Sequence, residues 1–540
     1  MIFASSSSFL HLEERILAEP IGYHWLISEM GVNVPDLETV SFLGDPGASF
    51  RLRHPHQAIK LFRKEYAVPP DPLEHLVFAI KHEHIDLPLI QKVFEKLEQS
   101  VVSDFVMKNP RGIYERRIGF LYEFLTGKNL GDPGIDTGNY VELLDSKKYF
   151  AGTVLKNKKW RIDDNLLGDS DFCPVVRKTP RLEGLMNKNL GEKARALLED
   201  YPSGIVHRAN QYLYVKETKS SFLIEREEPG ENRLERFVYL LRQSRSYPFE
   251  NKNDFVRIQN AIVDPRFANS DYRKTQNYVG QTLRGGEIIH YIPPSPDHVG
   301  SMMEGLIRSL DRMRRTVHPV VQAAVISFGF VFIHPFDDGN GRLHRFLIHQ
   351  ILSREGFTPD QAIFPVSAHI LSHMEEYNEC LESFSRRIMG MTDYSLDAGG
   401  TLAKKNDPVS FYRYFDATKM AEYLFGVIEN VIDGDLKEEF QFLVRYDNAK
   451  KDIQDRIDMP DRLIDLFIRF SLQNDGTISN SKRKSHFESL TEEEVGDLQN
   501  IVKSHFKKDF DPVLSEQLEK DSRADESPNH SRNQDFEPGP

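Results

Sequence analysis

The apolar run from Val320 to Ile333, together with the glycine-containing loop after it, constrains the fold more than any other stretch of this chain. The run is apolar at nearly every position, which is typical of a helix buried on all sides. Pro319 suits the first turn of such a helix, where a backbone N–H has no helical partner. The run is too short to span a bilayer and contains Gln322 and Ser327. We therefore expect a central helix of a globular core.

The loop reads His334-Pro-Phe-Asp-Asp-Gly-Asn-Gly-Arg-Leu-His-Arg345 and opens a second helical pattern. Apolar residues recur there at three- and four-residue steps, as on one face of a helix: Leu343, Phe346, Leu347, Ile351 and Leu352. The first turn of a helix presents unpaired N–H groups and the positive end of the helix dipole, and glycine lets an anion approach the backbone. The loop is therefore suited to binding a phosphate.

Charged side chains in the loop add the other parts of a phosphate-handling site. Arg342 and Arg345 could neutralise phosphate oxygens with a bidentate geometry that lysine lacks. Asp338 supplies a hard oxygen ligand of the kind that holds Mg²⁺ together with phosphates. His334 is the candidate for accepting a proton at neutral pH, because an unperturbed imidazole has a pKa near ~6.5. A turn with a structural histidine and solvated arginines is the alternative for each residue alone, but their joint occurrence favours a site.

This string resembles the signature of the Fic family, His-x-Phe-x-(Asp/Glu)-Gly-Asn-Gly-Arg-x-x-Arg, and matches it at every fixed position. The resemblance implies a helical core that transfers AMP from ATP to a hydroxyl group of a protein substrate, with Mg²⁺ bound across the phosphates. It implies that His334 is the catalytic base and Asp338 the metal ligand. The implied nucleotide and phosphate ligands are Gly339, Asn340, Gly341, Arg342 and Arg345, with Tyr377 as a candidate on the adenine side or, equally, a core aromatic.

Ser221 and Glu225 fit the Ser/Thr-x-x-x-Glu part of the inhibitory motif that some Fic proteins carry before the catalytic core. The resemblance implies that Glu225 pairs with Arg345, the last arginine of the signature. A carboxylate on a guanidinium meant for the γ-phosphate would block the site and repel an incoming triphosphate. Arg226 departs from the motif, which prefers glycine or asparagine at that position. The alternative is a serine on an exposed acidic helix.

A β-hairpin is predicted between Tyr278 and Tyr291, with a glycine-containing turn at Arg284-Gly-Gly286. The proline-rich tract from Ile292 to Pro296 then ends the second strand. The arrangement is similar to the flap that lies over the active site in Fic proteins and aligns the target segment. An exposed strand edge can hold an extended peptide through backbone hydrogen bonds. The candidate flap residues are Tyr278, Val279, Gly280, Ile289, His290 and Tyr291.

A chain of 540 residues exceeds the size of one ordinary core, so several domains are expected. The fold class is mainly α: a helical Fic-type core with a β-hairpin flap, flanked by N- and C-terminal helical regions. We predict an N-terminal helical domain of unassigned role at 1–200, the catalytic core at 210–395, a C-terminal helical domain at 400–518 and a disordered tail at 519–540. The core includes the inhibitory helix at about 218–228 and the flap at about 276–292.

The composition of the chain limits the classes of binding partner and the compartment that we expect. The net charge of -13 opposes sequence-independent binding to nucleic acid, which depends on neutralising phosphates. Two cysteines provide no disulfide framework and the N-terminus does not resemble a secretory signal, so a cytoplasmic location is expected. The expected partner is a protein with a Ser, Thr or Tyr hydroxyl, and self-modification and homo-oligomers are further expectations.

Two other functions remain open from the sequence. The same site could remove AMP from a modified protein, or transfer another nucleotide or phosphate-bearing group. A function of a different class is a ligand-sensing or DNA-binding regulator, in which the Fic core is a switch and residues 400–520 contact DNA.

Overall fold

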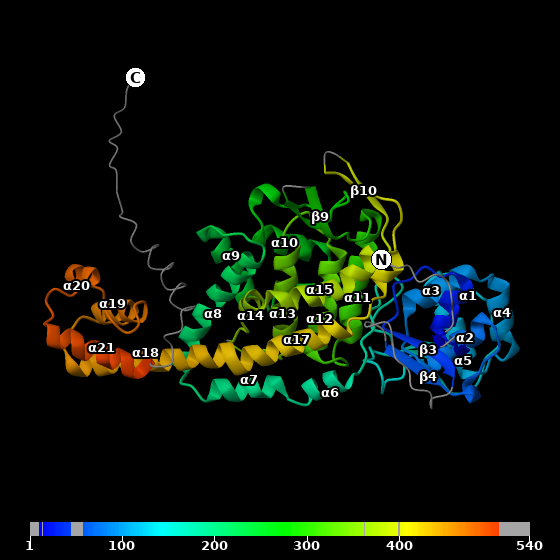
Figure 1. Ribbon diagram of the computed structural model, residues 1–540, viewed down its shortest axis with the longest axis horizontal. Helices are drawn as coiled ribbons and strands as arrows, with labels where there is room; N and C mark the ends of the chain where they lie inside the picture. Colours follow the sequence, from blue (N-terminus) through cyan, green and yellow to red (C-terminus); the bar gives the residue numbers. More distant parts are fainter. Residues whose placement is uncertain are drawn as a thin grey trace, which may run out of the picture. The chain divides into compact units, whose positions relative to one another are not determined.

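The computed structural model describes residues 10–12, 15–44, 58–283, 286–360, 362–397 and 400–506. These residues are mainly helical, as predicted (Figure 1). The chain divides into two compact units. Unit 1 comprises Met1–Ala196 and Asn210–Asp433, and unit 2 comprises Leu197–Ala209 and Gly434–Pro540. None of the described helices is long and apolar enough to cross a membrane.

The N-terminal part of unit 1 combines helices with two small sheets. Its helices are α1 (Tyr23–Met30), α2 (Pro72–His82), α3 (Leu87–Lys96), α4 (Gln99–Lys108), α5 (Ile113–Thr126), α6 (Pro180–Met186) and α7 (Leu190–Glu199), the last of which runs into unit 2. A four-stranded sheet has the order β1 (Leu10–Leu12), β2 (Arg15–Pro20), β3 (Thr39–Gly44), β4 (Ala58–Phe62), with β3 and β4 parallel. A three-stranded sheet has the order β5 (Val141–Glu142), β7 (Ile162–Asp164), β6 (Leu155–Asn157). The predicted helices are present, and the sheets are an addition to the predicted helical region.

The rest of unit 1 is organised around α12 (Pro319–Ile333), which is buried along most of its length, as the apolar run predicts. It packs against α11 (Pro296–Met313), α13 (Asn340–Arg354) and α17 (Thr418–Asn430). The surrounding helices are α8 (Ser203–Ile224), α9 (Glu231–Arg242), α10 (Lys252–Ile262), α14 (Val366–Ser372), α15 (Met374–Met389) and α16 (Val409–Arg413). Helices α16 and α17 lie beyond residue 400, where the sequence predicts a separate domain, yet α17 packs on the central helix.

The predicted hairpin is formed by β8 (Val279–Leu283) and β9 (Gly286–Tyr291), which pair antiparallel. The register shifts between Val279 and Gly280, which lie opposite Tyr291 and Ile289. Of the predicted turn Arg284-Gly-Gly286, Arg284 and Gly285 lie outside the described residues, and Gly286 is the first residue of β9. A second, short hairpin is made by β10 (Tyr394–Leu396) and β11 (Leu402–Lys404).

The segment predicted as an inhibitory helix at about 218–228 is the C-terminal part of the longer helix α8, which ends at Ile224. Glu225 and Glu227 therefore lie just beyond the helix end rather than on the helix. This difference in boundary places both carboxylates in a turn that faces the start of α13.

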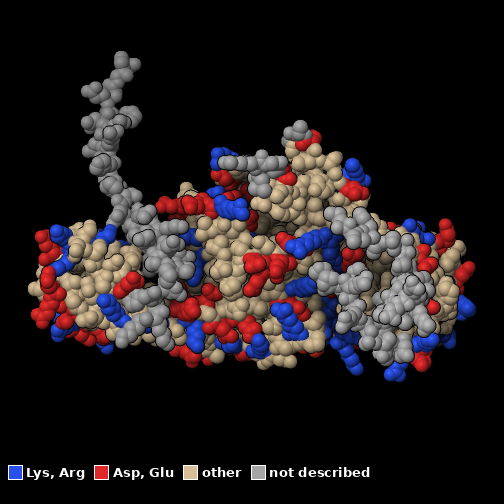
Figure 2. Space-filling model, in the orientation of Figure 1, with Lys and Arg blue, Asp and Glu red and all other residues tan. Residues whose placement is uncertain are grey.

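The described part of unit 2 beyond residue 433 contains α18 (Leu436–Arg456), α19 (Asp461–Leu472), α20 (Asn480–His486) and α21 (Glu492–Phe506). Thr491 caps α21: its hydroxyl accepts the Glu494 N–H at 3.2 Å, and the Glu494 carboxylate accepts the Thr491 N–H at 2.7 Å. Arg483 of α20 pairs with Glu492 at the start of α21. Figure 2 shows acidic and basic side chains interspersed over the displayed face. The predicted tail at 519–540 lies outside the described residues.

Candidate active site

The loop between α12 and α13 forms a cradle at a helix N-terminus. Helix α12 ends at His334, which has φ 51° and ψ 60°. Gly339 precedes α13 with φ 86°, a left-handed conformation that favours glycine. The first helical hydrogen bond of α13 runs from the Leu343 N–H to the Gly339 carbonyl. The N–H groups of the three residues before Leu343 therefore have no helical acceptor, which is the geometry predicted for a phosphate site.

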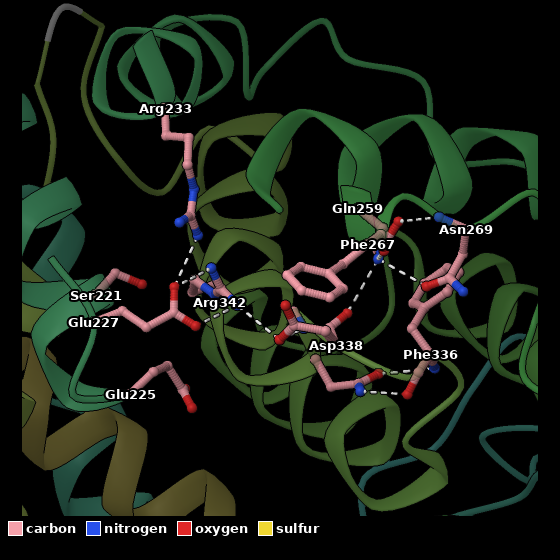
Figure 3. Close-up of polar contacts among 12 residues, drawn as sticks. Ser221, Glu225, Glu227, Arg233, Gln259, Phe267, Asn269, Phe336, Asp338 and Arg342 are labelled. Atoms are coloured by element: carbon pink, nitrogen blue, oxygen red, sulfur yellow. Dashed lines mark hydrogen bonds and ion pairs between the residues drawn. The ribbon is translucent and has the colours of Figure 1, made fainter. Parts of the chain in front are cut away.

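Phe336 and Asn340 hold this loop closed. The Phe336 ring is fully buried and lies 5.5 Å from the Tyr272 ring and 6.4 Å from the Phe330 ring. The Asn340 side chain accepts the Phe336 N–H at 3.0 Å and donates to the Phe336 carbonyl at 2.8 Å. Gln259 donates to the Asp338 carbonyl at 3.2 Å (Figure 3). Because the Asn340 amide is committed to Phe336, the part of Asn340 that remains for a phosphate is its backbone N–H.

His334 is placed and protonated as a general base would be. Its Nδ1 lies 3.2 Å from the Val331 carbonyl. A carbonyl only accepts hydrogen bonds, so the proton of the neutral ring sits on Nδ1 and Nε2 keeps its lone pair. Burial lowers the pKa of His334 to about 4. The imidazole is therefore neutral at physiological pH, the form that can accept a proton.

Arg273 fixes the backbone of the histidine, a role that the sequence did not reveal. Its Nε donates to the His334 carbonyl at 2.8 Å, and its backbone N–H donates to the Pro335 carbonyl at 2.8 Å. The same guanidinium donates to the Pro294 carbonyl after the flap. The side chain is buried, and burial lowers its pKa to about 10. Arg273 thereby ties the flap base to the catalytic loop, yet it lies in a polar stretch with no motif.

Arg345 is enclosed by the end of α8. Its side chain is 1% exposed. It donates to the Ser221 hydroxyl at 2.9 Å, to the Ser221 carbonyl at 2.6 Å and to Glu225 Oε1 at 2.9 Å. The structure thus brings together the three residues for which the sequence predicts an inhibitory contact.

A second carboxylate, Glu227, contacts the other arginine of the signature. Glu227 Oε2 lies 3.1 Å from Arg342 NH1 and Glu227 Oε1 lies 3.4 Å from Arg342 NH2 (Figure 3). Arg233 of α9 donates to the same carboxylate at 2.8 Å. Arg342 also donates to Asp338 Oδ1 at 2.8 Å. The sequence analysis did not single out Glu227, because the family motif contains one glutamate. A second glutamate two residues after Glu225 was the sequence feature that could have indicated it.

The turn at Arg226 explains the residue preference of the motif. Arg226 has φ 59°, in the left-handed region. The Glu227 N–H donates to the Phe222 carbonyl at 3.1 Å, which closes the end of α8 as a left-handed helix cap does. Glycine and asparagine adopt this conformation at lower cost than arginine. The arginine is therefore tolerated here but not favoured.

Helix α8 and the turn after it contact α13 through residues spaced four apart in the sequence. Glu217 accepts a 2.7 Å hydrogen bond from His349, Ser221 contacts Arg345, and Glu225 reaches Gly341. A Cβ on Gly341 would lie 2.0 Å from Glu225 Oε1. The Glu225 carboxylate therefore occupies the cradle at the start of α13, where the sequence predicts a phosphate.

Asp338 fits the predicted role of a Mg²⁺ ligand. Its side chain is 40% exposed, and its Oδ1 accepts the Gly339 N–H at 2.6 Å. Its Oδ2 accepts no hydrogen bond from the described residues. The described residues contain no group of three or more side chains that could hold a metal by themselves. Mg²⁺ commonly takes one carboxylate and completes its shell with phosphates and water, so a single exposed carboxylate beside a phosphate cradle suits it.

The flap residues divide into exposed and anchored ones. Val279 and Ile288 are exposed, and so is His290. Tyr291 is buried and its hydroxyl donates to the Phe332 carbonyl, two residues before His334. The hydroxyl of Tyr278 contacts Glu287 across the hairpin. An exposed strand pair is thus anchored next to the histidine.

Tyr377 lies in the core beside the second arginine. Its side chain is buried and its ring lies 6.2 Å from the His344 ring. Burial raises the pKa of its hydroxyl to about 12, and the nearby Arg345 opposes that rise. The structure places Tyr377 at the edge of the site, and its contact with adenine stays a prediction.

Comparison with known proteins identifies the central part of this chain. Residues 249–352 match the model of the Fic/DOC family. The chain is similar to the protein adenylyltransferase Fic of Culex quinquefasciatus, with 35% identity over 121 residues, covering 20% of this chain and 22% of that protein. The relative from Drosophila melanogaster is 34% identical over 141 residues, covering 25% of this chain and 26% of that protein. The chain thus spans about a quarter of the length of these curated relatives.

A crystal structure of a Fic family protein from Desulfovibrio desulfuricans aligns with 66% of this chain and 98% of its own, at 18% identity and a TM-score of 0.35. That overlap is too loose to support a conclusion about the fold. The range matched by the family model contains the signature loop at the start of α13. The chain therefore carries a domain of the Fic/DOC family, matched at residues 249–352.

Proposed function

We propose that this protein is an adenylyltransferase that transfers AMP from ATP to a Ser, Thr or Tyr hydroxyl of a protein, and that Glu225 restrains it. The observation that carries the proposal is the neutral His334, held by Arg273 beside the anion cradle of α13. The names of the similar proteins support the same reaction. Both cysteines are free, buried thiols, which supports a reducing compartment such as the cytoplasm.

The reaction is an in-line displacement at the α-phosphorus. The flap presents the target hydroxyl, and Nε2 of His334 accepts its proton. The hydroxyl oxygen forms a bond to the α-phosphorus while the bond from that phosphorus to the pyrophosphate oxygen breaks. Pyrophosphate leaves, and the target carries AMP through a phosphodiester.

The chain supplies the positive charge that this displacement requires. The N–H groups at Asn340 and Gly341 lie where negative charge accumulates on the phosphates. Arg342 and Arg345 would bind the β- and γ-phosphates once their carboxylate partners leave. Asp338 would hold Mg²⁺, which when bound neutralises phosphate charge.

The contacts of α8 oppose this binding mode. Both arginines are engaged by carboxylates, and Glu225 occupies the cradle itself. A triphosphate must displace these carboxylates, so the resting enzyme is restrained. The pairing of Glu225 with Arg345, braced by Ser221, is the proposed inhibitory contact.

Variants of His334 test the reaction. In a Glu225→Gly background, His334→Ala should abolish transfer of α-labelled AMP to the protein itself and to lysate proteins, while ATP still binds in calorimetry. Asp337→Ala is the control, because Asp337 is an exposed neighbour in the same loop. Transfer at an unchanged rate in His334→Ala would show that another group is the base.

A panel of labelled nucleotides separates the alternatives. Transfer from GTP, CTP or UTP in preference to ATP would show that the transferred group is a nucleotide other than AMP. Release of AMP from a premodified protein, without forward transfer, would favour the removal reaction. Preference for ATP with protein-bound label is the expected result.

A further inference from the structure

A separate cavity of about 170 Å³ lies in unit 1, between the N-terminal region and the end of the catalytic core. Its walls come from β3 and the segment before α3 on one side, and from α15 and α17 on the other. None of its lining residues belongs to the loop at 334–345. The volume is close to the ~150 Å³ of an engineered cavity that holds benzene. The cavity therefore suits a ligand with few non-hydrogen atoms.

The lining carries four basic and four acidic side chains, so its formal charge is zero. Part of this charge is already paired: Arg177 lies 2.7 Å from Asp416, and Lys419 lies 2.8 Å from Glu38. A lining with balanced charge does not favour a phosphate or a metal ion. It favours a ligand that carries both signs of charge.

Four charged side chains of the lining form no ion pair with a described residue. Lys60 donates to the His82 carbonyl and Glu83 accepts the Tyr23 N–H, and the other two, Arg387 and Asp86, are the pair that we consider for such a ligand. Arg387 makes no hydrogen bond or ion pair with the described residues. Asp86 caps α3 by accepting the Leu89 N–H at 3.0 Å, and no described cation lies within 4.0 Å of its carboxylate. The two influence each other, because burial raises the pKa of Asp86 and Arg387 opposes that rise. A guanidinium and a carboxylate thus line one cavity without touching.

We propose that this cavity binds a small zwitterion, a free α-amino acid with an apolar side chain. Its carboxylate would accept paired hydrogen bonds from Arg387, and its ammonium would donate to Asp86. Phe384, Ile388 and Met420 provide the apolar wall for the side chain. Water that bridges Arg387 and Asp86 is the competing occupant.

Ligand chemistry provides the first test. Each of the twenty L-amino acids is added to the full-length protein at up to millimolar concentration, and binding is followed by saturation-transfer NMR and calorimetry. We expect one or more apolar amino acids to bind. Their N-acetyl and methyl ester derivatives, which each lack one charge, should bind at least about tenfold more weakly, since each loses a charge-assisted hydrogen bond. No binding by any amino acid, or equal binding by the derivatives, would overturn the proposal.

Matched variants provide the second test. Arg387→Gln and Asp86→Asn should weaken binding by about 10- to 100-fold, and asparagine retains the helix cap. Arg386→Gln is the control, because the neighbouring Arg386 is 78% exposed and pairs with Glu382. Equal affinities for the Arg387 and Arg386 variants would contradict the site. If a variant fails to fold in circular dichroism, the comparison of derivatives on the wild-type protein decides the question.

Discussion

Replacing Glu225 with glycine should strengthen ATP binding and increase self-modification. Three hydrogen bonds now hold Arg345, and the one to Glu225 at 2.9 Å is the one that a phosphate must replace. The two contacts to Ser221 remain in the variant. The change therefore releases the cradle while leaving the guanidinium in place.

The size of the gain follows from the geometry. A hydrogen bond to a charged group contributes about 1.5–3 kcal/mol. The Glu225 side chain is 36% exposed, which favours the lower end of that range because water screens the pair. About 1.5 kcal/mol corresponds to roughly tenfold in affinity. Loss of repulsion between this carboxylate and the triphosphate adds to that value, so the dissociation constant of ATP should fall by at least about tenfold.

The variant should also depend more on its ligand for stability. Without nucleotide, Arg345 is a buried cation that has lost its carboxylate, which lowers the free energy of unfolding. Bound nucleotide raises that free energy by about 2.7 kcal/mol when its concentration is 100 times the dissociation constant. We therefore expect a lower Tm for the free variant and a larger rise in Tm with ATP than in the wild-type protein.

Calorimetry with a non-transferable ATP analogue, thermal unfolding and labelling from α-labelled ATP measure these effects. Glu228→Gly is the matched control, because Glu228 is an exposed carboxylate three residues further along. The inhibitory interpretation is refuted if the Glu225 and Glu228 variants bind ATP equally well and label themselves at the same rate.

Further changes in the same region have defined outcomes. Glu227→Gln should remove one of the two carboxylates on Arg342, leaving Asp338, and raise ATP affinity by several-fold in calorimetry, additively with Glu225→Gly unless the two glutamates leave together. Arg226→Gly relieves a left-handed arginine, so it should raise the unfolding free energy by up to about 1 kcal/mol and reduce labelling. The His334 ring should stay neutral from pH 7.5 down to about 5 in NMR, because its pKa is lowered to about 4. In the unfolded chain the same ring protonates near pH ~6.5, so this group reduces the stability of the folded protein as the pH falls from there toward 4. A titration midpoint near ~6.5 in the folded protein would contradict the geometry. Asp338→Asn should remove the dependence of ATP binding on Mg²⁺ concentration while Mg²⁺-free binding persists.

The catalytic loop could be predicted because its chemistry is local. The glycines, His334 and the two arginines lie within one turn and one helix start, and a helix N-terminus has the same properties in any fold. The apolar run before it predicted the central helix for a similar reason, since a helix that is apolar on all faces must be buried in the core. The periodicity of apolar residues and the residue types of the loop were sufficient to predict these elements.

The supporting contacts could not be predicted because they are tertiary. Arg273 and Glu227 resemble ordinary surface residues in sequence, and their roles depend on carbonyls and guanidinium groups far along the chain. The link from Glu225 to Arg345 spans 120 residues and came from resemblance, not from pattern. The three-stranded N-terminal sheet was missed because its strands have two or three residues each, too few to show an alternation of apolar and polar residues.

The glycine at 341 has a consequence for how the enzyme could be regulated. The space left by its missing Cβ holds the Glu225 carboxylate, and in the proposed function the same space receives a phosphate, so a side chain at position 341 would crowd both anions. In the proposed function, Glu225 would act as a tethered competitor whose effective concentration is set by the fold. If the tethered state is favoured by about 2 kcal/mol, about 3% of molecules are open and the apparent affinity for ATP falls by that fraction. On this proposal, a partner or modification that moves the end of α8 would control the rate, because such a movement changes the fraction of molecules whose cradle is free of Glu225.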